Sequence, residues 1–221
     1  MAAKFCIQRN TDGLPREALA IINAKRDWII RAEAEPDCIP IGSVEFCEPV
    51  FGRQPGLKQF YPEFLHHLMG RAWGVVSQPR AYRTAFYKDA TRWKSDFVAR
   101  VYQQGEEFPV TCELMYESEV VRFFDEWRFY IANGHVIDVG LYAGWDDTVF
   151  LSDAKLDRFV KAIPRNFSGA VDIGVCADGE LRLVECHPPF ACGWYGDDCN
   201  SYAMWMEQAW ECREFWIREG K

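Results

Sequence analysis

The stretch 170–187 constrains the fold of this chain more than any other segment. Apolar residues alternate with small or polar ones on both sides of the pair Asp178-Gly179, and an Asp-Gly pair between two such runs is typical of a β-hairpin turn. If Asp178 and Gly179 form the whole loop, counting outward along both strands places Asp172 directly opposite Glu185. The sequence therefore predicts an antiparallel hairpin in which two carboxylates face each other.

Two carboxylates that face each other across a hairpin repel one another, at a cost of some tenths of a kcal/mol that rises with burial. Alternation along the second strand predicts that Leu181, Leu183, Glu185 and His187 share one face. We therefore expect a positive group between Asp172 and Glu185. A hard divalent cation, Mg²⁺ or Mn²⁺, would meet this need. A solvated face, or a register shifted by a bulge, would remove it.

Cysteine chemistry is a weaker interpretation of the same region. Cys186, His187, Cys192 and Cys199 could form a zinc site, but no cysteine pair there has the usual C-x₂-C spacing. A cysteine nucleophile has no local signature either. The nine cysteines are odd in number and scattered, which indicates reduced thiols and a cytoplasmic protein.

The charge balance narrows the classes of partner. Lys and Arg total 25 against 33 Asp and Glu, for a net charge of −8, and an acidic chain is poorly suited to neutralising phosphates of nucleic acids. No apolar run approaches the ~18–20 residues that a membrane span needs, and the start lacks the apolar core of a signal peptide. We expect neither nucleic acid nor membrane as a partner.

Hydrophobic periodicity predicts a mixture of strands and helices. A second hairpin signal, Asn133-Gly134, joins two predicted strands. Two antiparallel hairpins among helices predict an α+β fold and argue against a doubly wound parallel sheet. The predicted strands are 4–8, 28–32, 81–88, 110–116, 126–132, 135–142, 170–176 and 180–187; the predicted helices are 14–25, one starting at Pro62, 153–163 and 201–218; 36–62 is expected to be mostly irregular.

Three cationic side chains upstream of the hairpin are candidates for binding an anion. Lys88 ends an apolar alternating strand and Lys94 follows in a polar loop, so both could hold phosphates as point charges. Glu126 and Arg128 form the polar face of the strand 126–131, where an arginine could bind phosphate or carboxylate with two hydrogen bonds. A solvated surface is the alternative for each of them.

Taken in order, these pieces resemble the ATP-grasp superfamily of carboxylate–amine ligases, over about residues 80–196. Its members have a strand-ending lysine, a second lysine in a phosphate-covering loop, a hinge strand and a closing Asp…Glu hairpin. In D-alanine–D-alanine ligase-like members the hairpin acids are spaced as Asp172 and Glu185 are here. The two glutamates around the hinge are spaced there as Glu119 and Glu126 are here.

The resemblance implies an ATP-grasp-like fold, in which two small α+β lobes with antiparallel sheets grip a nucleotide. It divides the chain into an N-terminal α/β region, 1–80, packed on the core, and an ATP-grasp-like domain with a C-terminal helix, 81–221. It also implies an ATP- and Mg²⁺-dependent ligase that joins a carboxylate to an amine, or to a thiol, through an acyl phosphate. The substrates would be small molecules or peptides. The oligomeric state is not implied.

The resemblance also implies roles for individual residues. The carried-over roles are ATP phosphates for Lys88 and Lys94, adenine for Glu119, Val120 and Val121, ribose for Glu126, Mg²⁺ for Asp172, Glu185 and His187, and catalysis for Arg128 and Lys94. Arg128 would steady the γ-phosphate or the acyl phosphate. The loop 188–198, with Trp194 and Tyr195, could form the floor of a substrate pocket.

Three positions depart from the family pattern. His187 stands where the family usually has asparagine, and imidazole suits softer ions than Mg²⁺. Ala170 stands where many relatives have arginine, so Arg128 or Lys94 would have to take that role. The segment 89–96 has no glycine. These departures favour the alternative of a non-catalytic ATP-grasp-like module that binds a nucleotide or a partner. A third hypothesis, a nucleotidyl transferase adenylated on Lys88, lacks the Lys-x-Asp-Gly pattern.

Overall fold

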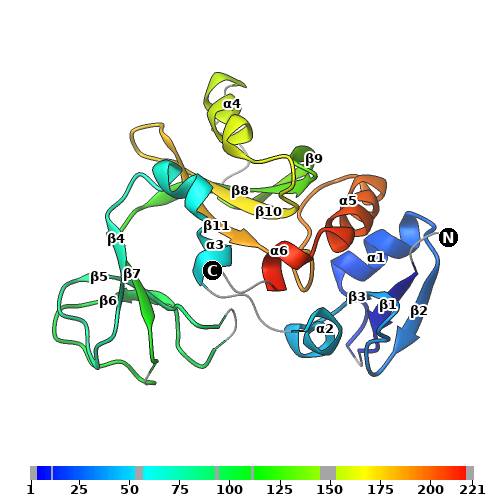
Figure 1. Cartoon of the computed structure of the whole chain (residues 1–221), viewed down its shortest axis with the longest axis horizontal. Coiled ribbons are helices and arrows are strands. Elements are labelled where there is room, and N and C mark those ends of the chain that lie inside the picture. Colours follow the sequence, from blue (N-terminus) through cyan, green and yellow to red (C-terminus); the bar gives the residue numbers. More distant parts are fainter. Residues whose placement is uncertain are drawn as a thin grey trace.

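The computed structural model describes residues 4–10, 12–52, 57–92, 95–110, 112–144 and 153–217. One three-stranded parallel sheet and two four-stranded antiparallel sheets, with helices against them, make up this part of the chain (Figure 1). The predicted α+β class is confirmed. Among the described residues, no helix is both long enough and apolar enough to cross a membrane.

The N-terminal sheet is parallel, with the strand order β2-β1-β3. Its elements are β1 (Phe5–Gln8), α1 (Arg16–Asn23), β2 (Trp28–Arg31), β3 (Ile39–Ile41), α2 (Val44–Phe51) and α3 (Leu57–Phe60). The prediction that 36–62 is mostly irregular is wrong. Pro40 is tolerated because β3 is an edge strand that pairs only with β1, and Ser43 caps α2 by accepting a hydrogen bond from the Phe46 backbone N–H at 3.3 Å.

The second sheet has the strand order β4-β7-β5-β6. Its strands are β4 (Trp73–Val76), β5 (Ala85–Asp89), β6 (Arg100–Tyr102) and β7 (Met115–Ser118). The strands predicted at 81–88 and 110–116 therefore start later than expected. β4 lies within the range 1–80 and pairs with β7, and the division of the chain at residue 80 stays a prediction.

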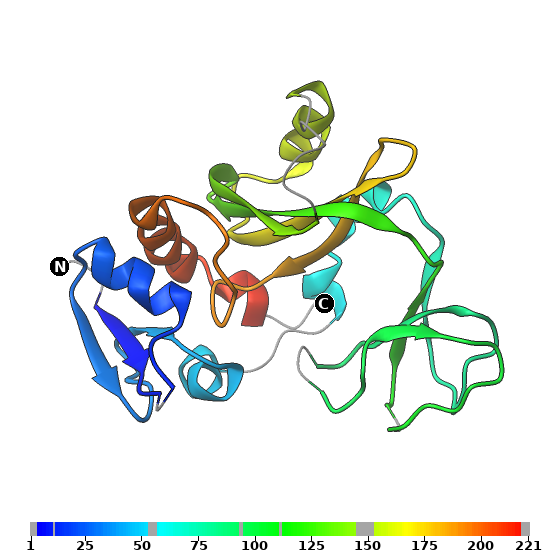
Figure 2. The same cartoon turned by 180° about the vertical axis from the view of Figure 1, so that it is seen from behind.

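The third sheet has the strand order β11-β10-β8-β9. Its strands are β8 (Phe123–Ala132), β9 (His135–Ala143), β10 (Gly169–Cys176) and β11 (Leu181–His187), and the 3₁₀ helix η1 (Glu63–Leu68), α4 (Asp153–Ala162), α5 (Cys199–Glu211) and α6 (Glu214–Ile217) complete the chain. The single predicted helix 201–218 is broken, because α5 ends at Cys212. The sheet lies between α4 and the N-terminal sheet (Figure 2).

The hairpin of β10 and β11 pairs Asp172 with Glu185, as predicted. The route to this register differs, however. The loop spans 177–179, since the Cys176 backbone N–H donates to the Glu180 carbonyl at 2.9 Å, and a bulge at Val184 then restores the predicted pairing. The expected shared face is therefore wrong: Leu181 and Leu183 face the core, while Glu185 and His187 face the other side with Asp172.

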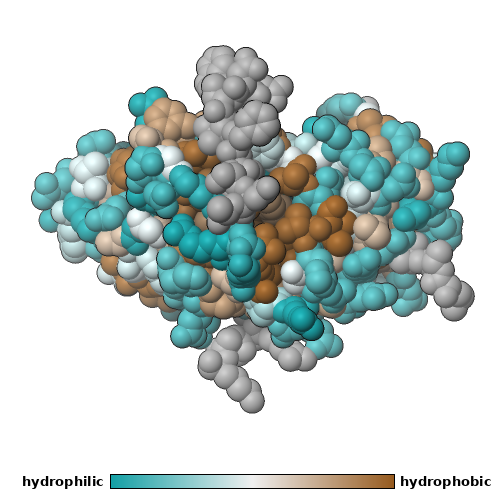
Figure 3. All heavy atoms as spheres, turned by 90° about the horizontal axis from the view of Figure 1, so that it is seen from above, coloured by the Kyte–Doolittle hydropathy of each residue, from teal (hydrophilic) through white to brown (hydrophobic). Residues whose placement is uncertain are grey.

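Tryptophan side chains pack the space between the third sheet and the C-terminal helices. Trp205 is fully buried and its indole N–H donates to the carbonyls of Ile131 and Gly169 at 3.0 and 3.2 Å. The Trp216 indole donates to the Ser168 carbonyl at 2.8 Å. Much of the aromatic content therefore serves packing. Seen from above, some hydrophobic residues remain on the surface near the middle of the molecule (Figure 3).

Candidate active site

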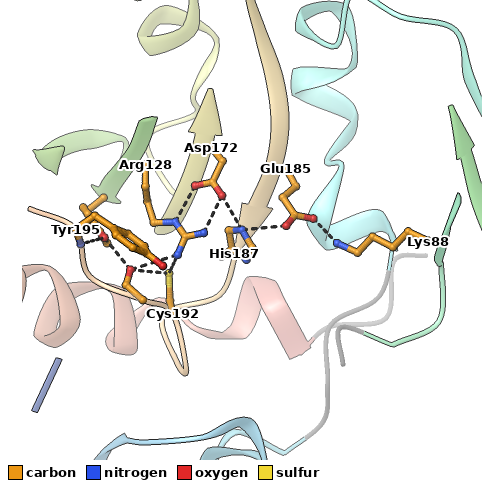
Figure 4. A network of polar contacts seen from close by, with 9 residues as sticks. Lys88, Arg128, Asp172, Glu185, His187, Cys192 and Tyr195 are labelled. Atoms are coloured by element: carbon orange, nitrogen blue, oxygen red, sulfur yellow. Dashed lines mark hydrogen bonds and ion pairs between the residues drawn. The ribbon is translucent and has the colours of Figure 1, made fainter. Parts of the chain in front are cut away.

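A continuous line of charged side chains crosses the third sheet and reaches β5 (Figure 4). Lys88 forms an ion pair with Glu185. His187 Nε2 lies 3.2 Å from Glu185 Oε1 and 2.9 Å from Asp172 Oδ2. Arg128 binds Asp172 with two hydrogen bonds, Nε to Oδ1 at 2.8 Å and Nη2 to Oδ2 at 2.7 Å. Five residues that the sequence singled out thus come together.

Strand order explains this line. β10 lies between β11 and β8, so Asp172 is paired with Glu185 on one side and with Arg128 on the other. Asp172, Arg128 and His187 are only 1%, 5% and 5% exposed. The positive charge that the paired carboxylates require is supplied first by the protein's own cations.

These contacts fix the protonation of the buried groups. Burial would raise the pKa of Asp172, but His187 and Arg128 outweigh it and the pKa is lowered. The pKa of Glu185 is also lowered, because Lys88 and His187 outweigh burial. The pKa of His187 is raised, because the two carboxylates outweigh the effect of burial on the imidazolium. The two acids are therefore held ionised beside a protonated imidazole.

Arg128 is also held on its far side. Its Nη1 donates to the Gly193 carbonyl at 3.2 Å and to Cys192 Sγ at 3.5 Å. The rings of Tyr142 and Tyr195 lie 4.8 and 5.3 Å from its guanidinium carbon. The guanidinium is thus fixed by Asp172, the loop after β11 and two aromatic rings. The sequence indicated this loop as a pocket floor but not its contact with Arg128.

A cavity of about 330 Å³ opens beside the Lys88 end of the line. The predicted residues that line it are Lys88, Val120, Val121, Glu126 and Glu185. The pKa of Glu126 is raised by burial and by the nearby Asp172 and Glu185. Apolar and cationic side chains thus share one cavity with an acid, which is the composition that a nucleoside phosphate needs.

Arg71 borders the same cavity, and no sequence pattern pointed to it. Its guanidinium donates to the carbonyls of Leu183 and Val184 at 2.6 and 3.1 Å, and to the Tyr116 hydroxyl at 3.2 Å. Arg71 therefore holds the bulge in β11 that turns Glu185 toward the site. A lone arginine in a turn carries no pattern that reveals such a long-range contact.

Two predicted residues are not part of this arrangement. The Glu119 carboxylate turns away from the cavity and accepts a hydrogen bond from the Ala72 backbone N–H at 2.9 Å. The Glu119 backbone N–H donates to the Ala72 carbonyl, also at 2.9 Å. Lys94 lies outside the described residues.

The three predicted metal ligands fit a divalent cation. One donor atom from each of Asp172, Glu185 and His187 lies within 4.8 Å of the other two. His187 Nε2 already lies within hydrogen-bond distance of both carboxylates, so a cation would take the place of its proton. Two carboxylates and one imidazole suit Mn²⁺ better than Mg²⁺, which prefers oxygen ligands.

A family model described as an ATP-grasp domain, family 2 of its clade, matches residues 71–205, more than half of the chain. This range contains every residue of the charged line and most of the cavity beside it. A comparison with curated proteins gives no match.

Three solved structures resemble nearly the whole chain. A RimK domain ATP-grasp protein from Sphaerobacter thermophilus is 12% identical, with 92% of this chain and 99% of that chain covered and a TM-score of 0.54. The D-cycloserine synthetase DcsG is 14% identical, with coverages of 95% and 100% and a TM-score of 0.53. D-alanine–D-alanine ligase from Bacillus anthracis, complexed with ATP, is 10% identical, with coverages of 96% and 99% and a TM-score of 0.51. At these identities the likeness establishes the fold, which is that of ATP-grasp ligases.

Proposed function

This chain belongs to the family of ATP-grasp domains whose model it matches, and from that premise we propose that it is an ATP- and Mg²⁺-dependent ligase that joins a carboxylate to an amine. A thiol acceptor is the second option for the same chemistry. The observation that carries the proposal is the line of contacts from Lys88 through Glu185, His187 and Asp172 to Arg128. It begins at a cavity of nucleotide-binding composition and holds two paired acids ionised.

In this proposal the nucleotide occupies the cavity beside Lys88. Val120 and Val121 border the adenine, Glu126 accepts hydrogen bonds from the ribose hydroxyls, and Lys88 binds the phosphates. Lys88 would leave Glu185 to do so. Glu119 holds the hinge to Ala72 and contributes its backbone alone to this region.

The reaction has two steps. A carboxylate oxygen of the first substrate attacks the γ-phosphorus of ATP, and the bond to the bridging oxygen breaks to give an acyl phosphate and ADP. The amine nitrogen then attacks the acyl carbon, the C–O bond to phosphate breaks, and the nitrogen loses a proton. Mg²⁺ held by Asp172, Glu185 and His187, or Mn²⁺ in its place, would neutralise charge on the phosphoryl oxygens.

Arg128 and Lys94 are the proposed catalytic cations. Arg128 lies beside Asp172 on the neighbouring strand, which is where a guanidinium could replace the arginine that Ala170 lacks. Its contacts to Asp172, Gly193 and Cys192 orient it before any substrate binds. Lys94 would cover the phosphates from the loop after β5. The division into 1–80 and 81–221, and a cytoplasmic location, belong to the same proposal.

Thermal unfolding with and without Mg²⁺ plus a non-hydrolysable ATP analogue tests the nucleotide site. Ligand at ~100 times its dissociation constant adds about 2.7 kcal/mol to the stability of the folded protein, a rise of several degrees for a chain of this size. We expect the rise in wild type and in the control Glu180→Gln, whose carboxylate is on the same hairpin and about half exposed. We expect no rise in Asp172→Asn or Glu185→Gln.

Turnover separates the ligase from a binding module. With hydroxylamine as a small nucleophile and a panel of carboxylates, an acyl phosphate is trapped as a hydroxamate while ADP is released. A protein that binds the nucleotide yet forms no hydroxamate and no ADP with any carboxylate would instead be the non-catalytic module. A wild type that no nucleotide stabilises at millimolar concentration would contradict both hypotheses.

A further inference from the structure

A second cavity, of about 320 Å³, lies at the opposite end of the charged line. It is bordered by Gln8, which ends β1, by Gly42 and Ser43 just after β3, and by Glu17 in the first turn of α1. Cavities at the carboxyl ends of parallel strands are a common place for ligands in open α/β sheets. The volume is near the lower end of small-molecule sites.

This cavity shares its wall with the arginine of the site. Cys192 and Gly193 line it, and the same two residues accept hydrogen bonds from Arg128 Nη1. Ala191, also in the wall, has φ of 45°, in the left-handed region that costs an alanine energy. The loop that separates the cavity from Arg128 is thus held in one strained conformation.

The polar lining indicates what the cavity can bind. Among the described residues that line it, Glu17 carries the only formal charge. Glu17 Oε1 accepts a hydrogen bond from the Trp194 backbone N–H at 2.8 Å, which anchors the carboxylate at the cavity wall. Arg16, its neighbour, is turned toward the Gly196 carbonyl at 2.7 Å and the Trp194 ring at 4.8 Å. With an acid and no cation in its wall, the cavity is suited to a cationic or hydrogen-bond-donating ligand.

We propose that this cavity binds the amine co-substrate, a small primary amine whose nitrogen donates a hydrogen bond to Glu17. The inference rests on the proposed ligase function for the ligand's role, although the binding itself can be measured without ATP. It places the nucleotide and the amine at the two ends of the line from Lys88 to Arg128. An amine held behind the loop 191–193 would lie next to the guanidinium that steadies the acyl phosphate.

A carboxylate is the competing ligand, because the N-terminal turns of α1 and α2 also border the cavity. Alaninamide and propanoate serve as matched probes, since each is small and they carry opposite charge. 5-Fluorotryptophan incorporation gives a ¹⁹F signal from each of the nine tryptophans. The signal of Trp194, assigned with Trp194→Phe, reports on the cavity because its backbone binds Glu17.

We expect millimolar alaninamide to shift the Trp194 signal saturably and propanoate to leave it in place. Glu17→Gln, which keeps the acceptor for Trp194, should weaken alaninamide about tenfold or more, and Glu211→Gln, an exposed acid on α5, should not. A propanoate response, a response that survives in Glu17→Gln, or no response to either probe would each overturn the inference. Lys88→Met should keep the response, so loss of nucleotide binding contradicts the ligase proposal alone.

Discussion

Arg128 and Asp172 lie directly opposite each other on β8 and β10, and the guanidinium binds both carboxylate oxygens at 2.8 and 2.7 Å. Both side chains are almost fully buried. The pair therefore has two functions in the structure. It keeps Asp172 ionised and oriented, and it anchors the loop at Gly193 through Nη1. A mutation at either residue acts on stability and on the site at once.

Replacing Arg128 should destabilise the protein strongly. Arg128→Leu leaves the Asp172 carboxylate buried beside Glu185, and breaking a buried pair in this way costs about 3–5 kcal/mol. Arg158→Leu is the control, because the Arg158 side chain is 54% exposed and 3.9 Å from its partner Glu180, and such pairs contribute about 0–1 kcal/mol. Urea unfolding measures both.

The double variant Arg128→Leu/Asp172→Leu sharpens this test. It removes both charges, so it should recover part of the stability lost in Arg128→Leu. A double variant less stable than the single one, or equal losses in Arg128→Leu and Arg158→Leu, would contradict the buried ion pair.

His187 should make the stability of the metal-free protein depend on pH. Its pKa is raised in the folded state above the unfolded value near 6.5. The stabilisation from the imidazolium is therefore complete below about pH 6.5 and is lost as the pH rises through the folded pKa. In urea unfolding with a chelator present, the stability difference between wild type and His187→Asn should shrink as the pH is raised from about 6.

The exposed His135 at the start of β9 provides the control for this measurement. His135→Asn should follow the wild-type pH profile throughout. A wild-type advantage over His187→Asn that grows with pH would have the wrong sign and would rule out a protonated His187 between the two acids.

Some parts of this site could be predicted from the sequence because they depend on local patterns. The Asp178-Gly179 signal identified the hairpin, and Asp172 does pair with Glu185. That pairing was right for an incomplete reason, since a longer loop and the bulge at Val184 cancel each other. Neither the loop length nor the bulge has a distinct signature, which is why the predicted face of Leu181 was wrong.

Other parts depend on strand order, which no local pattern contains. The contact of Arg128 with Asp172 requires β8 to lie beside β10, although α4 separates them in the chain. The hold of Arg71 on the β11 bulge and of Gly193 on Arg128 joins distant parts of the chain in the same way. In 36–62, the prolines suggested irregular chain, whereas an edge strand and a capped helix accommodate Pro40 and Pro49.

The close approach of β9 to the loop after β11 predicts that Gly140 cannot be replaced. A β-carbon at Gly140 would overlap the backbone of Tyr195 and Gly196, and overpacking of this kind costs about 1–3 kcal/mol. Gly74→Ala is the matched control, because Gly74 also lies in a strand and nothing lies within 4 Å of the added carbon. It should be neutral or slightly stabilising.

Thermal unfolding of Gly140→Ala and Gly74→Ala measures the difference. Because the displaced loop also holds Arg128, Gly140→Ala should weaken any activity more than its loss of stability alone explains. Equal melting temperatures for the two variants would show that the loop can move away from β9 without cost.

The two glutamates around the hinge should differ in their effect on ATP binding. Glu126 lines the cavity beside Lys88, whereas the Glu119 carboxylate is bound to the Ala72 N–H. Glu126→Ala should weaken ATP about 10–100-fold, the effect of losing a charged hydrogen bond to the ribose. It should not lower stability, because the pKa of Glu126 is raised, which means that its ionised form is unfavourable in the folded state. Calorimetric titration with the ATP analogue should show a change within about threefold for Glu119→Ala. If Glu119→Ala weakens ATP as much as Glu126→Ala does, the ribose does not bind at Glu126.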